Sequence, residues 1–217
     1  MIVDLVINEM IPLVAKERLA DFIDVFCDTG FFTVEETDRM LEAGVRYGLT
    51  PKIHANELDY SGGIEVGVKY GALSVDHLEC VGDKEIAALK SSKTMPTILP
   101  GAAFFLNMPY SPARKMISAG LPVAMASDFN PGSSPSGNMQ MVMTFACVNY
   151  RLTPQEALNA TTINSAYAMG LSQTHGSICR GKKANFYITK AIPTLEYIPY
   201  YYGTNKVSRT FLNGKEQ

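Results

Sequence analysis

The sequence predicts an α/β fold, a partial TIM-type (β/α) barrel of about five βα units with a small appended C-terminal β element. Three observations support this prediction. Short apolar runs of strand length alternate with helical segments through most of the chain, as in a parallel sheet. A histidine or aspartate stands at the C-terminal end of several of these runs, where barrels place their chemistry. The last stretch is rich in β-branched and aromatic residues and contains an Asn213-Gly214 turn.

The βα units are defined by apolar runs and by helix start and stop signals. The first helix should begin at a capping box, Thr33-Val-Glu-Glu36, and should end near Tyr47, before Gly48. Gly71 and Gly120 mark the ends of two later helices in the same way. In chain order we predict strands at 21–27, 51–55, 72–76, 95–99 and 122–126, and helices at 33–47, 62–70, 84–89 and 111–119.

The pattern changes after the polar loop that follows residue 126. A helix is expected over residues 139–150, and a second helix should start after Thr153, with Pro154 at its first position. This second helix should be interrupted near Thr161-Thr162 and resume to Met169. Strands are then predicted at 184–189, 197–202 and 207–212. We therefore divide the chain into two parts, a barrel part over residues 1–170 and an appended β-sandwich segment over residues 171–217.

Composition excludes several classes of protein. Of 217 residues, 47% are hydrophobic and 18% are charged, as in a globular α/β protein. The net charge of −2 and the pI of about 5.9 indicate neither a nucleic-acid nor a membrane surface. The N-terminus lacks the basic start of a signal peptide, and the four cysteines are scattered without a C-x-x-C motif. These features predict a cytoplasmic location.

Three polar side chains stand at equivalent ends of predicted strands. His54 and His77 end the second and third strands, and Asp128 follows the fifth. Because the C-terminal ends of parallel strands share one face, we expect these side chains on one rim. Imidazole and carboxylate ligands together suit zinc or iron. The alternative for each histidine is a core residue bonded to a backbone carbonyl, and we interpret His175 as a surface or capping residue.

Several motifs resemble those of a known family. The segments KIHANE, GALSVDHLE, LPGAAFFL and ASDFNPGSSP are similar to segments of imidazolonepropionases, metal-dependent hydrolases of the amidohydrolase superfamily. The segment GSICRGKKANFYI resembles the closing motif of that superfamily, which leads into a small β-sandwich. The resemblance covers essentially the whole chain.

The resemblance implies hydrolysis of the cyclic amide of 4-imidazolone-5-propanoate to N-formimidoyl-L-glutamate, in histidine degradation. It implies zinc or iron as cofactor, with His54 and Asp128 as metal ligands. Asp128 can also accept the proton of the attacking water, His77 matches a histidine that helps activate water or polarise the substrate carbonyl, and Glu57 matches a position near both water and substrate. The residues implied in substrate binding are Glu57, Asn130, Gly132 and Ser133.

One departure from the family pattern concerns the metal site. The family has a His-x-His pair on its first barrel strand, and these 217 residues contain no such pair. We therefore expect the chain to correspond to the C-terminal half of the enzyme and to turn over substrate poorly alone. The alternatives are another amidohydrolase, similar to cytosine or guanine deaminases, and a non-catalytic remnant. The expected partner is a small-molecule substrate, with a homodimer as an option and no nucleic acid or membrane.

Overall fold

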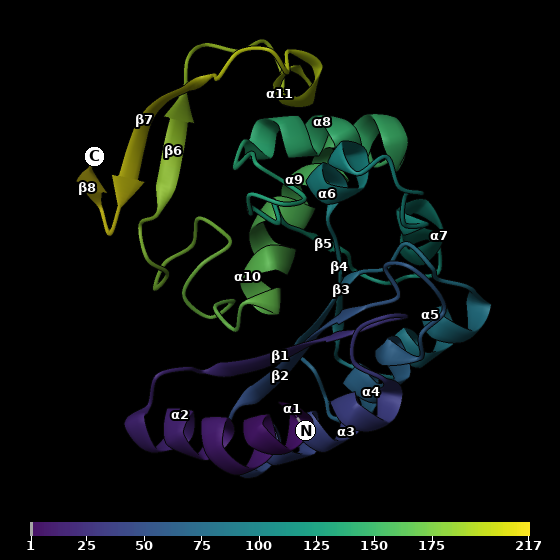
Figure 1. Ribbon diagram of the computed structural model, residues 1–217. Coiled ribbons are helices and arrows are strands. Elements are labelled where there is room, and N and C mark those ends of the chain that lie inside the picture. The colour runs from purple at the N-terminus through teal and green to yellow at the C-terminus, as the bar shows by residue number, and fades with distance from the viewer. Residues whose placement is uncertain (1) are drawn as a thin grey trace. The chain divides into compact units, whose positions relative to one another are not determined.

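The computed structural model describes residues 2–217 and contains alternating strands and helices (Figure 1). The chain divides into two compact units, Met1–Thr97 with Ser118–Leu121, and Ile98–Ile117 with Pro122–Gln217. In chain order the elements are α1 (Ile2–Leu5), the π-helix η1 (Val6–Met10), α2 (Ile11–Glu17), β1 (Phe22–Cys27), α3 (Val34–Arg46), β2 (Thr50–Ala55), α4 (Gly63–Lys69), β3 (Ser74–His77), α5 (Asp83–Lys90), β4 (Met95–Ile98), α6 (Pro100–Phe105), α7 (Ala113–Ser118), β5 (Ala124–Met125), α8 (Met139–Asn149), α9 (Pro154–Asn159), the π-helix η2 (Ala160–Asn164), α10 (Ser165–Ala168), β6 (Phe186–Thr189), α11 (Tyr197–Tyr200), β7 (Val207–Leu212) and β8 (Lys215–Glu216).

The five predicted strands of the main sheet are confirmed, in the order β1-β2-β3-β4-β5. The pairs β1–β2, β2–β3 and β3–β4 are parallel. Their register places Phe26 opposite His54, and His54 opposite Asp76. Side chains that project from one face of the sheet therefore come from neighbouring strands at the same level.

Helices α3 and α4 cover one face of the strands in the first unit (Figure 1). The predicted capping box at the start of α3 is present, with Thr33 and Glu36 bonded to each other's backbone N–H groups. Helix α4 approaches the sheet through glycine. A Cβ on Gly67 would lie 2.8 Å from Val75 Cγ1 and 2.9 Å from Ile53 Cγ2, so no larger residue fits without displacement. Close packing of this kind holds the strands of the first unit in place.

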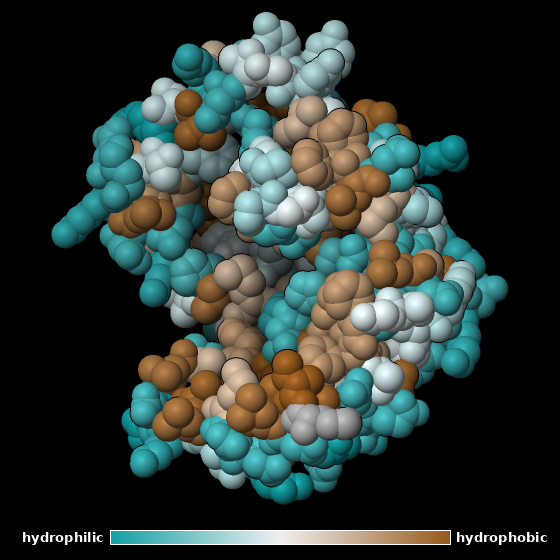
Figure 2. Space-filling model, in the orientation of Figure 1, coloured by the Kyte–Doolittle hydropathy of each residue, from teal (hydrophilic) through white to brown (hydrophobic). Residues whose placement is uncertain are grey.

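The N-terminal helices α1, η1 and α2 were not predicted from the sequence. They bury Val3 and Ile11, and Asp4 forms an ion pair with Arg39 of α3 at 2.6 Å. Their other large apolar side chains, such as Leu13, are exposed. Figure 2 shows apolar side chains at the surface where Figure 1 places these helices. No helix among the described residues is long and apolar enough to cross a membrane.

The second unit contains the predicted helices after the polar loop. Thr153 and Glu156 form the capping box of α9, with Pro154 at its first turn. The expected interruption near Thr161-Thr162 is a π-helical turn, η2, that joins α9 to α10. The hydroxyl of Thr162 donates to Leu158 O at 2.6 Å inside this turn. Helices α6 and α8, together with residues 134–138, line an apolar pocket of about 220 Å³.

The small C-terminal sheet is antiparallel, in the order β6-β7-β8. Residues Asn213 and Gly214 join β7 to β8 with φ angles of 51° and 77°. Two consecutive positive φ angles are typical of the Asn-Gly hairpin turn that the sequence predicts. The appended β element is therefore confirmed at 186–189 and 207–212.

The predicted strand at 197–202 is wrong, because residues Tyr197–Tyr200 form the helix α11. Tyrosine-rich segments favour strands, but Pro199 has no N–H to donate to a ladder. Tertiary packing supplies the alternative. Ile198 and Pro199 are buried in the second unit, and Thr144 of α8 donates a hydrogen bond to Pro199 O at 2.8 Å.

Candidate functional site

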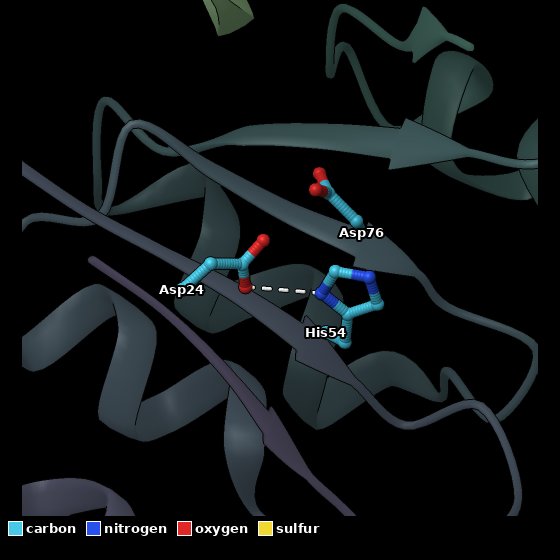
Figure 3. Close-up of side chains that lie close together, drawn as sticks. All are labelled: Asp24, His54 and Asp76. Atoms are coloured by element: carbon cyan, nitrogen blue, oxygen red, sulfur yellow. Dashed lines mark hydrogen bonds and ion pairs between the residues drawn. The ribbon is translucent and has the colours of Figure 1, made fainter. Parts of the chain in front are cut away.

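Three neighbouring strands of the first unit contribute side chains to one cluster (Figure 3). Asp24 of β1, His54 of β2 and Asp76 of β3 each present one possible metal-ligating atom, all within 4.8 Å of one another. His54 Nδ1 lies 3.0 Å from Asp24 Oδ1. Because a carboxylate only accepts hydrogen bonds, this contact places the ring proton of His54 on Nδ1. The cluster thus combines the imidazole and carboxylate groups that bind zinc.

The electrostatics of the cluster are set by burial and one lysine. Burial raises the pKa of Asp76, and the ammonium of Lys52 opposes that rise. Lys52 Nζ lies 3.9 Å from Asp76 Oδ2 and donates to Ser74 Oγ at 2.6 Å. Asp76 Oδ1 is buried and has no hydrogen-bond partner among the described residues. A buried carboxylate oxygen in this state fits a site that receives a cation.

His77 lies beside the cluster, at the end of β3. Its ring centroid is 5.1 Å from that of His54, and its Nδ1 is 3.6 Å from Glu57 Oε2 and 3.9 Å from Glu79 Oε2. Burial, with a smaller contribution from His54, lowers the pKa of His77 to about 3. His77 is therefore a neutral imidazole at pH 7, able to donate one hydrogen bond and to accept another.

The backbone at these strand ends adopts conformations that L-residues seldom adopt. Asn56, His77 and Leu78 have φ angles of 56°, 82° and 70°. Each lies in the left-handed region, which costs about 1–3 kcal/mol for a residue other than glycine. Burial of all three side chains and a hydrogen bond from Cys80 N to Asn56 O at 2.8 Å maintain this geometry. Strain of this kind is concentrated at functional sites.

The loop after β5 is organised in the second unit around one amide side chain. Asn130 Nδ2 donates to Asp128 O and to Ser133 Oγ, both at 2.7 Å. Asn130 Oδ1 accepts from the N–H groups of Gly132 at 2.8 Å and Ser133 at 2.7 Å. Ser133 Oγ in turn donates to Asp128 Oδ2 at 3.2 Å. These contacts bring the four predicted loop residues together, with the amide of Asn130 engaged inside the loop.

The sequence-predicted residues therefore form two groups. The first unit brings His54, His77 and Glu57 together, and the second brings Asp128 together with its loop. Sequence reasoning missed Asp24 and Asp76 beside His54, and Glu79 beside His77. The sequence offered a signal for the two aspartates, because each lies within a predicted strand. Asp24 is the central residue of DFIDVFC, and Asp76 directly precedes His77. The roles of the predicted residues remain predictions.

Comparison with known proteins identifies the family. Residues 53–216 match the model of the amidohydrolase family. The chain belongs to the amidohydrolase family. The match includes the strand of His54, the strand of His77 and the loop of Asp128. These are the elements that the motifs had indicated.

Curated relatives of this amidohydrolase are named imidazolonepropionase. The chain is 55% identical to the protein of Christiangramia forsetii over 212 residues, which are 98% of the chain and 52% of the relative. It is 54% identical to that of Flavobacterium johnsoniae, with the same two shares. Identity to the Thermoanaerobacter pseudethanolicus protein is 45%, over 95% of the chain and 49% of the relative. The chain spans about half the length of these relatives.

Solved structures share the fold at low sequence identity. An adenosine deaminase from Xanthomonas campestris with bound zinc matches with a TM-score of 0.77 and 15% identity, over 96% of the chain and 55% of that protein. A 5-methylcytosine deaminase from Klebsiella pneumoniae matches with a TM-score of 0.78 and 20% identity, over 95% and 58%. The α/β sheet of this amidohydrolase is consistent with part of a (β/α) barrel. The family and the cluster of Asp24, His54 and Asp76 suggest a divalent metal.

Proposed function

We propose that this amidohydrolase acts in the hydrolysis of 4-imidazolone-5-propanoate to N-formimidoyl-L-glutamate. The observation that carries the proposal is the grouping of His54, His77 and Glu57 in the first unit, three residues that the motifs had selected separately. Curated relatives named imidazolonepropionase, at 43–55% identity, support the choice of this substrate. The chain spans about half the length of each relative. We therefore propose the hydrolysis for this chain together with the half that it lacks relative to them.

The donor set beside His54 fits a divalent metal, and we propose zinc or iron. His54 would hold the ion, with Asp128 as a second ligand. Such an ion supplies Lewis acidity and an activated water near neutral pH. Asp24 keeps the proton of His54 on Nδ1 and thereby orients the imidazole ring.

The remaining residues act on the substrate and its proton. Asp128 receives the proton from the attacking water. His77, as a neutral imidazole, donates a hydrogen bond to the carbonyl oxygen of the ring while charge develops there. Glu57 accepts a hydrogen bond from a ring N–H, which orients the cyclic amide for attack. The loop of Asn130, Gly132 and Ser133 offers polar groups to the rest of the substrate, with its shape set by the side chain of Asn130.

The test measures loss of imidazolonepropionate and formation of N-formimidoyl-L-glutamate. The chain is combined with the N-terminal half of the Christiangramia forsetii relative, with zinc or iron added. We expect turnover of about one per second or faster, in the usual range for enzymes. His54→Ala should lower this rate by about a hundredfold or more, the cost of misplacing reacting groups by about 1 Å. His175→Ala, at a turn in the C-terminal region, is the matched control and should leave the rate unchanged.

The same preparation separates the alternatives. Deamination of cytosine or guanine in place of imidazolonepropionate hydrolysis would assign the chain to another amidohydrolase activity. Absence of turnover on all three substrates, in a preparation that contains stoichiometric metal, would contradict the proposal and favour a non-catalytic remnant.

A further inference from the structure

Asp28 is a buried carboxylate that the proposed reaction does not use. It follows the last residue of β1, and 4% of its surface is exposed. Its Oδ1 accepts from the N–H of Thr29 at 2.8 Å. Its Oδ2 accepts from two backbone N–H groups across the sheet, those of Glu57 at 2.7 Å and Leu58 at 3.0 Å. Hydrogen bonds from backbone N–H groups to a carboxylate are stronger than bonds between neutral groups, so these three contacts hold the backbone around Asp28 firmly.

The geometry in question is the path of the chain as it leaves β2. Asn56, with a φ of 56°, turns the backbone immediately before Glu57. The side chain of Asn56 donates to Cys80 O at 2.9 Å and accepts from Ser61 Oγ at 3.1 Å, which anchors the turn on its other side. Asp28 therefore accepts hydrogen bonds from the backbone N–H groups of Glu57 and Leu58, which directly follow the turn at Asn56.

The backbone that Asp28 holds carries the side chain of Glu57. The Glu57 side chain is 10% exposed, and its Oε2 is 3.6 Å from Nδ1 of His77. Because Glu57 projects from a backbone unit held by Asp28, a shift of that unit moves the carboxylate relative to His77. From these contacts we propose that Asp28 is a positioning residue, which acts through the backbone of Glu57 to hold its carboxylate against His77. The inference rests on the proposed function, because it gives Glu57 a role in turnover.

The first test needs no turnover. In the full chain, Asp28→Ala should raise hydrogen exchange at the amides of Glu57 and Leu58 by about tenfold to a hundredfold, as expected when hydrogen bonds to a charged acceptor are lost. The NMR signals of the His77 ring at constant pH should shift in Asp28→Ala in the same direction as in Glu57→Gln. Asp59→Ala is the matched control, because Asp59 is an exposed carboxylate of the same loop that accepts from the neighbouring Tyr60 N–H at 2.7 Å. It should change neither the exchange at Glu57 nor the His77 signals.

The second test uses the preparation that turns over imidazolonepropionate. Asp28→Asn and Asp28→Ala should lower kcat/KM with zinc content unchanged, and Asn should be the milder substitution because it retains one acceptor oxygen. A double-mutant cycle with Glu57→Gln should be non-additive, so that the double variant loses little more than Glu57→Gln alone.

Two results would overturn the inference. One is unchanged exchange at Glu57 and Leu58 in a folded Asp28→Ala variant. The other is full additivity of Asp28→Asn with Glu57→Gln. If the wild-type preparation is inactive, the proposed function fails, while the exchange and NMR measurements still decide whether Asp28 positions Glu57.

Discussion

Asp24 lies where it can orient the ring of His54, the histidine that we propose as a metal ligand. Its Oδ1 lies 3.0 Å from His54 Nδ1, although the two residues are 30 positions apart in the sequence. The motif KIHANE had indicated His54 but carried no information about the atom that would orient its ring. A carboxylate on the second nitrogen of a ligating histidine fixes the ring and makes it a stronger donor.

We predict that Asp24→Ala raises the dissociation constant for zinc by about 10–100-fold, the usual effect of removing such a partner. Asp24→Asn should be milder, because its amide oxygen still accepts the ring N–H. Competition with a chromophoric chelator measures the constant. The control is Asp21→Ala, which removes an exposed carboxylate just before the same strand. Equal zinc affinity in Asp24→Ala and wild type would show that Asp24 has no part in the site.

At the scale of elements, one ion pair joins two helices of the second unit. The guanidinium of Arg114 in α7 holds both carboxylate oxygens of Glu156 in α9 and also donates to Arg151 O at 3.2 Å. Glu156 is at the same time the acidic member of the α9 capping box. The hydrogen bond from Arg114 is the main cause that lowers the pKa of Glu156 below its ordinary value of 4.5.

This lowered pKa gives a pH dependence with a definite sign. Because the folded state favours the carboxylate, the stabilisation is present above pH 4.5 and is lost as the pH falls through the lower folded pKa. Glu156→Gln keeps the capping box and removes the charge. We expect it to lower the free energy of unfolding by less than about 1 kcal/mol at pH 7, since the pair is partly exposed, and to have almost no effect in strong acid.

Chemical denaturation at several pH values measures this difference. Glu36→Gln is the matched control, because Glu36 occupies the same position in the capping box of α3. It should change stability little across the range. A difference between wild type and Glu156→Gln that grows toward acid would contradict the assignment.

The elements also show where sequence reasoning succeeded. The capping box at Thr33, the helix start at Thr153 and the Asn213-Gly214 turn were predicted correctly, because each depends on residues at most three positions apart. The helix at Tyr197–Tyr200 was predicted as a strand, because its conformation depends on burial of Ile198 and on a bond from distant Thr144. The helices α1, η1 and α2 were missed because their stabilising contacts include Arg39, far along the chain.

At the scale of the whole molecule, the chain combines the fold of a family with about half the length of its curated relatives. Its 217 residues include His54 and Asp128 but no His-x-His pair. The two metal ligands that we propose, His54 and Asp128, would by themselves leave a divalent ion largely hydrated and poorly positioned.

We predict that the chain assayed alone, with zinc or iron added, hydrolyses imidazolonepropionate much more slowly than the preparation that contains the N-terminal half of a relative. Both preparations are assayed with equal metal and equal chain concentration. A control preparation that contains only the N-terminal half excludes activity from that partner. Turnover by the chain alone of about one per second or faster would show that it completes a site by itself.

The amino-acid sequence by itself determined the order of most strands and helices, the family resemblance and the identity of the residues at the strand ends. These properties follow from local periodicity, turn chemistry and short motifs. Only the tertiary structure decided that Asp24 and Asp76 lie beside His54. It also decided that Asp28 accepts a hydrogen bond from the Glu57 N–H and that the Glu57 carboxylate lies near His77. The physical reason is register. Parallel pairing brings residues from different strands to the same level, and no local signal in the sequence specifies which partners will meet.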